Sequence, residues 1–110
     1  MTNPRALSWT APTKNTDGTN ITYALDYEVG VQQPDNTITG VLTTPGSLNP
    51  QGQYEVLVAD VAAISSIGSH TVAVRAINRA KPTEKSVWTN TLTFVNSTET
   101  PEAPLAFTVS

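Results

Sequence analysis

The sequence contains no cysteine among its 110 residues. A disulfide framework and a thiolate metal site are therefore excluded, and the fold has to rely on a hydrophobic core without covalent cross-links. Histidine occurs once, which excludes a metal site built from several imidazoles. No run of about 18 apolar residues occurs, and no apolar segment follows Met1, so we expect neither a membrane span nor a signal peptide. The N-x-S/T motifs at Asn20 and Asn96 are accordingly expected to carry no glycan.

Charge of one sign is also scarce. Six basic and nine acidic residues give a net charge of -3, and they are spread along the chain without long runs. Binding to nucleic acid or to an anionic membrane needs a concentrated positive surface, so we expect neither partner. The sequence also lacks a Gly-rich phosphate loop, a calcium loop and a paired acid-base constellation. We therefore expect no cofactor, no metal and no enzymatic activity.

The chain does contain short segments in which apolar and polar residues alternate, bounded by Gly, Pro, Asn and Asp. This period of two predicts β-strands, and no long segment has the period of a helix. The expected strands cover residues 6–11, 23–31, 38–43, 54–59, 68–78 and 86–95. Residues 38–43 are expected at a sheet edge and residues 68–78 in a sheet interior. In the last strand, Trp88, Leu92 and Phe94 should share one face.

Several motifs in these segments have the spacing of a known family. They are Leu7-Ser-Trp9 with Pro12, Tyr54-Glu-Val-Leu-Val58, His70-x-x-x-Val74-x-Ala76-x-Asn78 and Ser86-x-Trp88-Thr89. As a set they resemble the fibronectin type III domain, an immunoglobulin-like fold. The resemblance implies an all-β, two-sheet antiparallel β-sandwich of about seven strands, formed by residues 1–95, with Trp9 in its core.

His70 stands where the family usually has a tyrosine whose hydroxyl anchors the corner between two strands. The resemblance therefore implies a structural role at this corner, with the imidazole hydrogen-bonded to nearby backbone. A pH switch or a metal ligand is the alternative, although no second histidine exists to complete a metal site.

Surface contacts are expected around the turn between residues 68–78 and 86–95. Four cations surround this turn, namely Arg75, Arg79, Lys81 and Lys85. A contact with an acidic partner and ordinary solvation both explain them. For Trp88 we favour a stabilising stack on Arg75, formed through a bulge, over a role as a ligand-binding aromatic.

The chain ends with an apolar alternating segment, residues 105–110, after a Pro/Thr/Ser-rich linker at residues 96–104. Leu105, Phe107 and Val109 fall on one side of this segment and are candidate partner-binding residues. The strand that begins the family's fold is missing before residues 6–11. Three accounts stay open: the segment is exchanged with a neighbouring molecule, it completes its own sandwich, or it marks a domain boundary or disordered tail.

These expectations describe a non-enzymatic structural or interaction module. The leading interpretation is a bacteriophage virion protein, made in the host bacterial cytoplasm. It would be a capsid decoration or tail-associated protein that binds other virion subunits, further copies of itself or the cell surface. The alternative is a carbohydrate-binding or adhesion module excised from a larger extracellular bacterial protein, with a cell-surface glycan as its ligand. Virion assembly genes beside this gene would favour the first interpretation, and flanking domains in the same gene would favour the second.

Overall fold

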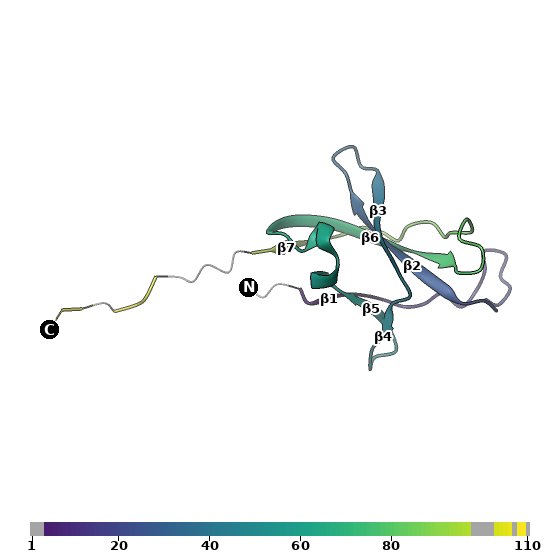
Figure 1. Cartoon of the computed structure of the whole chain (residues 1–110), viewed down its shortest axis with the longest axis horizontal. Coiled ribbons are helices and arrows are strands. Elements are labelled where there is room, and N and C mark those ends of the chain that lie inside the picture. Colours follow the sequence, from purple (N-terminus) through teal and green to yellow (C-terminus); the bar gives the residue numbers. More distant parts are fainter. Residues whose placement is uncertain (1–3, 98–102, 107, 110) are drawn as a thin grey trace.

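The structure of the chain, a computed structural model, describes residues 4–97, 103–106 and 108–109. The described residues form an all-β sandwich whose seven strands make two antiparallel sheets (Figure 1). The predicted fold class is therefore confirmed. Helix is limited, in this described part, to the 3-10 turns η1 (Val58–Asp60) and η2 (Ala62–Ile64), and neither could cross a membrane.

The two sheets have the strand orders β1-β5-β4 and β3-β2-β6-β7. The three-stranded sheet contains β1 (Ala6–Trp9), β4 (Ser47–Leu48) and β5 (Tyr54–Leu57). The four-stranded sheet contains β2 (Leu25–Gln32), β3 (Ile38–Thr44), β6 (Gly68–Asn78) and β7 (Leu92–Asn96). β3 lies at a sheet edge and β6 in a sheet interior, as the alternation predicted.

The core lies between the inward faces of the two sheets. On β2 the odd-numbered residues Tyr27 and Val29 are buried and face the other sheet. Trp9 of β1 is 8% exposed and packs on Tyr27 with ring centroids 5.0 Å apart. Ile64 of the η2 turn is fully buried in the same core. Each large apolar side chain buried in this way stabilises the fold by about 1.5–3 kcal/mol, so the sandwich needs no cross-link.

The strand predicted at residues 86–95 is shorter than expected. Regular pairing with β6 covers β7 alone, from Leu92 to Asn96. The prediction of one shared face is wrong for Trp88, which lies on the outer face of the sheet against Gly30 and Arg75. Leu92 instead faces the other sheet.

Two β-bulges explain the reversal of Trp88. The Ser86 N–H donates to the Ala76 carbonyl oxygen, and the Ala76 N–H donates to the Ser86 hydroxyl oxygen. In the same way the Thr89 N–H donates to the Val74 carbonyl oxygen, and the Val74 N–H donates to the Thr89 hydroxyl oxygen. Three residue steps along this segment therefore match two steps along β6, which is the definition of a bulge. The extra residue turns Trp88 outward, and a second extra residue between Thr89 and β7 restores the inward direction by the start of β7.

Candidate functional site

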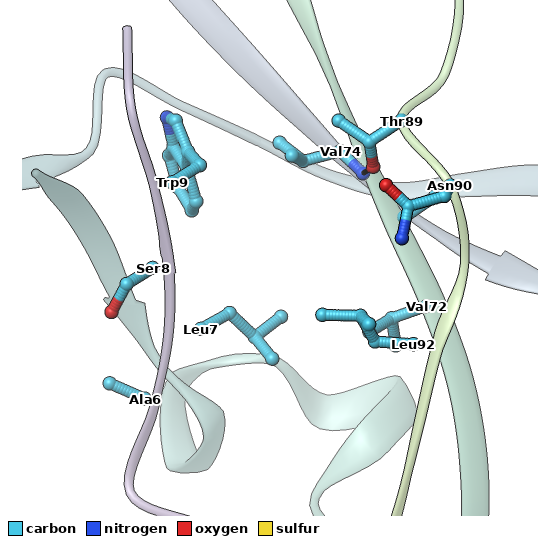
Figure 2. A pocket seen from close by; sticks show the side chains of 10 residues that line it. Ala6, Leu7, Ser8, Trp9, Val72, Val74, Thr89, Asn90 and Leu92 are labelled. Carbon is cyan, nitrogen blue, oxygen red and sulfur yellow. Dashed lines mark hydrogen bonds between the residues drawn. The ribbon is translucent and has the colours of Figure 1, made fainter.

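An apolar groove runs between the two sheets along one side of the sandwich (Figure 2). Its volume is about 300 Å³. Leu7 and Trp9 of β1 line it from the three-stranded sheet, and Val72, Val74 and Leu92 line it from the four-stranded sheet. Among the polar residues that line it, Thr89 and Asn90 come from the bulged segment before β7 and Ser8 comes from β1. The groove is thus bounded by β1, an edge of one sheet, and by β7, an edge of the other.

The ladder between β1 and β5 shows which backbone groups of β1 face outward. The Val58 N–H donates to the Arg5 carbonyl oxygen at 3.0 Å, so these two residues form a hydrogen-bonded pair. Hydrogen-bonded and non-hydrogen-bonded pairs alternate along an antiparallel ladder. The odd-numbered residues of β1 therefore bond to β5, whereas the N–H and C=O groups of Ala6 and Ser8 point away from it.

The ladder on the other side of β5 agrees with this assignment. The Asn49 N–H donates to the Gln53 carbonyl oxygen at 2.8 Å, so the odd-numbered residues of β5 bond towards β4 and the even-numbered residues bond towards β1. Within the described residues, no strand pairs with the outer edge of β1. An unpaired edge beside an apolar groove is a site where an extended segment can add as a further strand.

The floor and the rim of the groove differ in exposure. Val72 is buried, whereas Leu92 is 66% exposed although its side chain faces the groove. Covering an apolar side chain of this size yields about 1.5–3 kcal/mol. Occupation of the groove would therefore be favourable as well as sterically allowed.

The candidate partner-binding residues of the C-terminal segment lie outside the sandwich. Leu105 and Val109 are 89% and 94% exposed, and Phe107 lies outside the described residues. The described residues of this segment take part in no strand and stand apart from both sheets (Figure 1). Ala106 has a φ of 56°, a left-handed conformation that is incompatible with a strand at that residue. The structure thus does not place this segment in the chain's own groove.

Trp88 and Arg75 form the stack that the sequence favoured. The Arg75 guanidinium carbon lies 4.2 Å from the centre of the Trp88 ring. The same guanidinium donates a hydrogen bond from Nε to Glu28 Oε1 at 2.6 Å, and its Nη2 forms an ion pair with that oxygen at 2.5 Å. Gly30 lies beneath the ring, and a Cβ there would come within 2.7 Å of it, so only glycine allows the ring to pack this closely. The arrangement is a packed ladder on the outer face of the sheet.

The other three cations of the predicted surface contact do not form a free positive patch. Arg79 pairs with Asp26 at 2.9 Å, and Lys85 Nζ lies 3.9 Å from Glu28. Lys81 is exposed in the turn before residue 84. Arg75, Arg79 and Lys85 thus lie against Glu28 or Asp26, so the side chains of three of the four cations already have partners within the sandwich.

The corner before β6 contains His70 and a residue that the sequence did not point to. His70 Nε2 lies 2.8 Å from the Ser66 carbonyl oxygen, so the expected hydrogen bond to nearby backbone is present. Asn96 is 5% exposed, and its amide nitrogen donates to the carbonyl oxygens of Ile64 and Ser66, both at 2.8 Å. A buried amide held in this way is closed to glycan attachment. No local sequence signal identifies this contact, because it joins residues about thirty positions apart.

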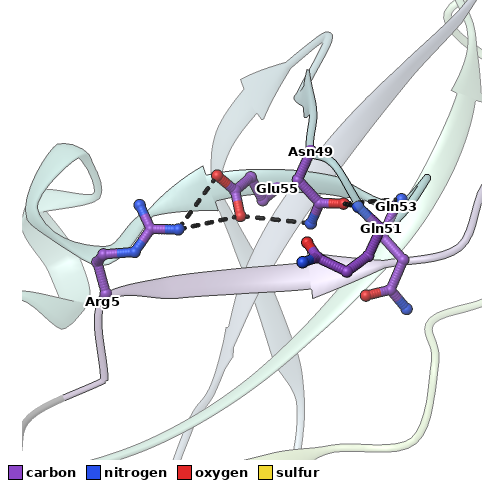
Figure 3. A network of polar contacts seen from close by, with 5 residues as sticks. All are labelled: Arg5, Asn49, Gln51, Gln53 and Glu55. Atoms are coloured by element: carbon purple, nitrogen blue, oxygen red, sulfur yellow. Dashed lines mark hydrogen bonds and ion pairs between the residues drawn. The ribbon is translucent and has the colours of Figure 1, made fainter.

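The outer face of the three-stranded sheet is polar and internally paired (Figure 3). The Glu55 carboxylate accepts hydrogen bonds from Arg5 and from Asn49, each at 3.4 Å. Asn49 Oδ1 in turn accepts from the backbone N–H groups of Gln51 and Gln53, each at 3.0 Å. Since these groups already have partners, this face offers less to a binding partner than the groove does.

Metal ligation is not supported by the described residues, which contain no group of three or more His, Asp or Glu side chains able to hold an ion. The groove at the β1 edge is accordingly the candidate functional site. Comparison with protein-family models, curated proteins and solved structures finds no match to this chain.

Proposed function

We propose that this chain is a fibronectin type III-like sandwich that acts as a non-enzymatic structural or interaction module. The groove at the open β1 edge is its binding surface, and an extended apolar strand of a partner subunit is its ligand. The family resemblance supports the proposal, because the first strand of that fold would lie beside β1, at the edge that is open here.

One observation carries the proposal: unpaired backbone groups of a strand edge and an uncovered apolar groove lie at the same place. The backbone groups of Ala6 and Ser8 point out from the sheet edge, and the apolar groove lies directly beside them. An added strand would meet both requirements at once, since its backbone would bond to β1 while alternate side chains filled the groove.

The other surfaces of the sandwich are less suited to binding, because their charged and polar side chains already have partners. The Arg75 guanidinium is engaged by Glu28 and Trp88, and the outer face of the other sheet carries its own polar network. The chain's single histidine, His70, is hydrogen-bonded at its corner. These pairings support a role in assembly over a role in catalysis.

The setting that we propose is a bacteriophage virion, in which the chain is a capsid decoration or tail-associated protein that binds other virion subunits. A small sandwich with one adhesive edge suits repeated addition to a particle surface. The carbohydrate-binding alternative gains less support, because Arg75 covers a face of Trp88 and Tyr27 is buried in the core. Neither ring is free to stack on a sugar.

The test uses particles from a phage that encodes the chain. Mass spectrometry of purified particles should detect the chain as a component. Particles grown without it should bind the added recombinant protein. The Leu92→Asp variant, which places a charge in the groove, should fail to bind. Ile67→Asp is the matched control, because Ile67 is 70% exposed and does not line the groove. Absence of the chain from particles, or equal binding by both variants, would refute the proposal.

A further inference from the structure

We infer that the strand that fills the groove is the C-terminal segment, residues 105–109, of a second copy of this chain. This inference rests on the proposed function and names the partner at the same site. The groove needs an extended segment that presents apolar side chains on one face and small or polar side chains on the other. The C-terminal segment has this pattern in its sequence, with Leu105, Phe107 and Val109 alternating with Ala106 and Thr108.

The backbone geometry assigns each set of side chains to a face. In an antiparallel addition, residues that bond to Ala6 and Ser8 point their side chains to the same face as these two, which is the solvent face. Residues between them point into the groove. Ala106 and Thr108 therefore bond to the edge, and the three apolar residues of the segment enter the groove beside Leu7. Five residues at about 3.4 Å each extend about 17 Å, which matches a short strand such as β1.

The chain's own segment is poorly placed to make this addition. Asn96, at the end of β7, lines the same surface hollow as Pro4 and Arg5, so the chain leaves the sandwich at the end where β1 begins. A direct return along the edge would run parallel to β1. An antiparallel return has to cross the length of the groove first, and the eight residues 97–104 extend at most about 29 Å for that crossing and both turns. A second copy approaches from outside and has no such limit.

The exposure of the free segment agrees with an occupant from another molecule. Leu105 and Val109 are 89% and 94% exposed even though the start of the groove is close to the end of β7. Ala106 has to leave its left-handed conformation on docking, and this change relieves backbone strain. Burial of the apolar side chains supplies a further driving force.

The proposed contact between copies has a defined symmetry. The donated C-terminal segment and the groove that accepts it are different surfaces of the same chain, so the contact is heterologous. Each copy can donate to one neighbour and accept from another. Assemblies therefore grow head to tail, as rings where the rotation closes and as open chains where it does not.

The experiment separates donor from acceptor in purified protein without particles. The Leu105→Asp/Val109→Asp variant removes the donor and leaves the groove intact. The Leu92→Asp variant blocks the groove and leaves the donor intact. Masses are measured by light scattering over a concentration series, and circular dichroism verifies that both variants fold. Ile67→Asp serves as the control for an added surface charge.

We expect the unsubstituted chain and Ile67→Asp to form oligomers that dissociate on dilution. Each of the two interface variants should be monomeric alone, and an equimolar mixture should give a dimer mass, because one variant supplies the segment and the other the groove. A mixture that stays monomeric would overturn the inference, and so would oligomers that persist without the donor. A chain that is always monomeric and melts at lower temperature without Leu105 and Val109 would indicate self-completion instead. If the chain is monomeric but still binds particles through the groove, the proposed function stands and the occupant belongs to another subunit.

Discussion

Leu7 of β1 and Leu92, the first residue of β7, point towards each other across the groove (Figure 2). Facing apolar residues of two packed sheets normally meet at the closed side of a sandwich. Here an open apolar groove lies between the two residues, and within the described residues no strand pairs with the outer edge of β1 beside it.

The direction of the Ser8 N–H can be tested by proline substitution. Ser8→Pro removes an N–H that points to the open edge, so the chain should fold with a small change in melting temperature but should lose assembly. Leu7→Pro is the matched control, because the Leu7 N–H bonds to β5 and its removal should lower the melting temperature strongly. Thermal unfolding and light scattering measure the two effects. Equal destabilisation by both prolines would contradict the ladder assignment.

Glu28 should contribute more to stability than Glu55. Glu28 is largely buried, accepts a hydrogen bond from Arg75 Nε and forms an ion pair with the same guanidinium, so Glu28→Gln should lower the free energy of unfolding by about 1–3 kcal/mol. Glu55 pairs at 3.4 Å with the exposed Arg5, and Glu55→Gln should cost less than about 1 kcal/mol. Urea unfolding of the two variants gives the comparison. A reversed order would show that the ladder on the outer face contributes little.

The corner before β6 should depend on Asn96 more than on His70. Asn96→Ala leaves the buried Ile64 carbonyl oxygen without its Asn96 donor, and we expect a loss of about 1–3 kcal/mol. His70→Phe removes one hydrogen bond, but the Ser66 carbonyl oxygen keeps Asn96 as a donor, so the loss should be about 0.5–1.5 kcal/mol. Chemical unfolding measures both. A larger effect of His70→Phe would give the histidine the leading role at this corner.

Two matching turns should make the fold sensitive to acid. The Thr37 hydroxyl and backbone N–H donate to Asp35 and lower the pKa of its carboxyl below the ordinary value of 3.8. A pKa that is lower in the folded state gives stability that is present above the unfolded pKa and is lost as the pH falls through the folded pKa. The turn at residues 35–37 should therefore loosen in strong acid.

A titration followed by NMR tests the cause of this shift. Thr37→Val removes the hydroxyl, the first cause, and should raise the pKa of Asp35 towards its ordinary value. The pKa of Asp17, which the Thr19 hydroxyl and backbone N–H lower in the same way, should stay unchanged and serves as an internal control. An unchanged Asp35 titration in Thr37→Val would contradict the assigned cause.

Alternation was enough to predict the strands that bury one face. β2 and β6 were found in this way, because each lies between two neighbours and carries apolar residues such as Val29 and Val72 on the face towards the other sheet. The motif around Trp88 indicated its bulge and its stack on Arg75, whereas alternation alone put Trp88 on the same face as Leu92. Alternation takes no account of the hydrogen bonds that Ser86 and Thr89 form with a strand distant in sequence. Pairing across such distances is set by the whole fold.

The candidate site could be predicted only in part, because some of it depends on a local sequence pattern and the rest depends on contacts between distant parts of the chain. The apolar alternation of residues 105–109 is visible in the sequence and marked a segment in need of a partner. The groove is not visible, since it arises where β1 and β7, edges of different sheets, come to the same side of the sandwich. Asn96 was missed because its contacts lie in another part of the chain.

Residue-specific amide hydrogen exchange tests the addition of a strand to β1 most directly. In the unsubstituted chain at concentrations where it assembles, the amides of Ala6 and Ser8 should exchange slowly, because the added strand bonds to this edge. In Leu105→Asp/Val109→Asp they should exchange rapidly, while the amides of Leu7 and Trp9 stay protected by β5 in both proteins. Equally rapid exchange of Ala6 and Ser8 in the two proteins would contradict the account.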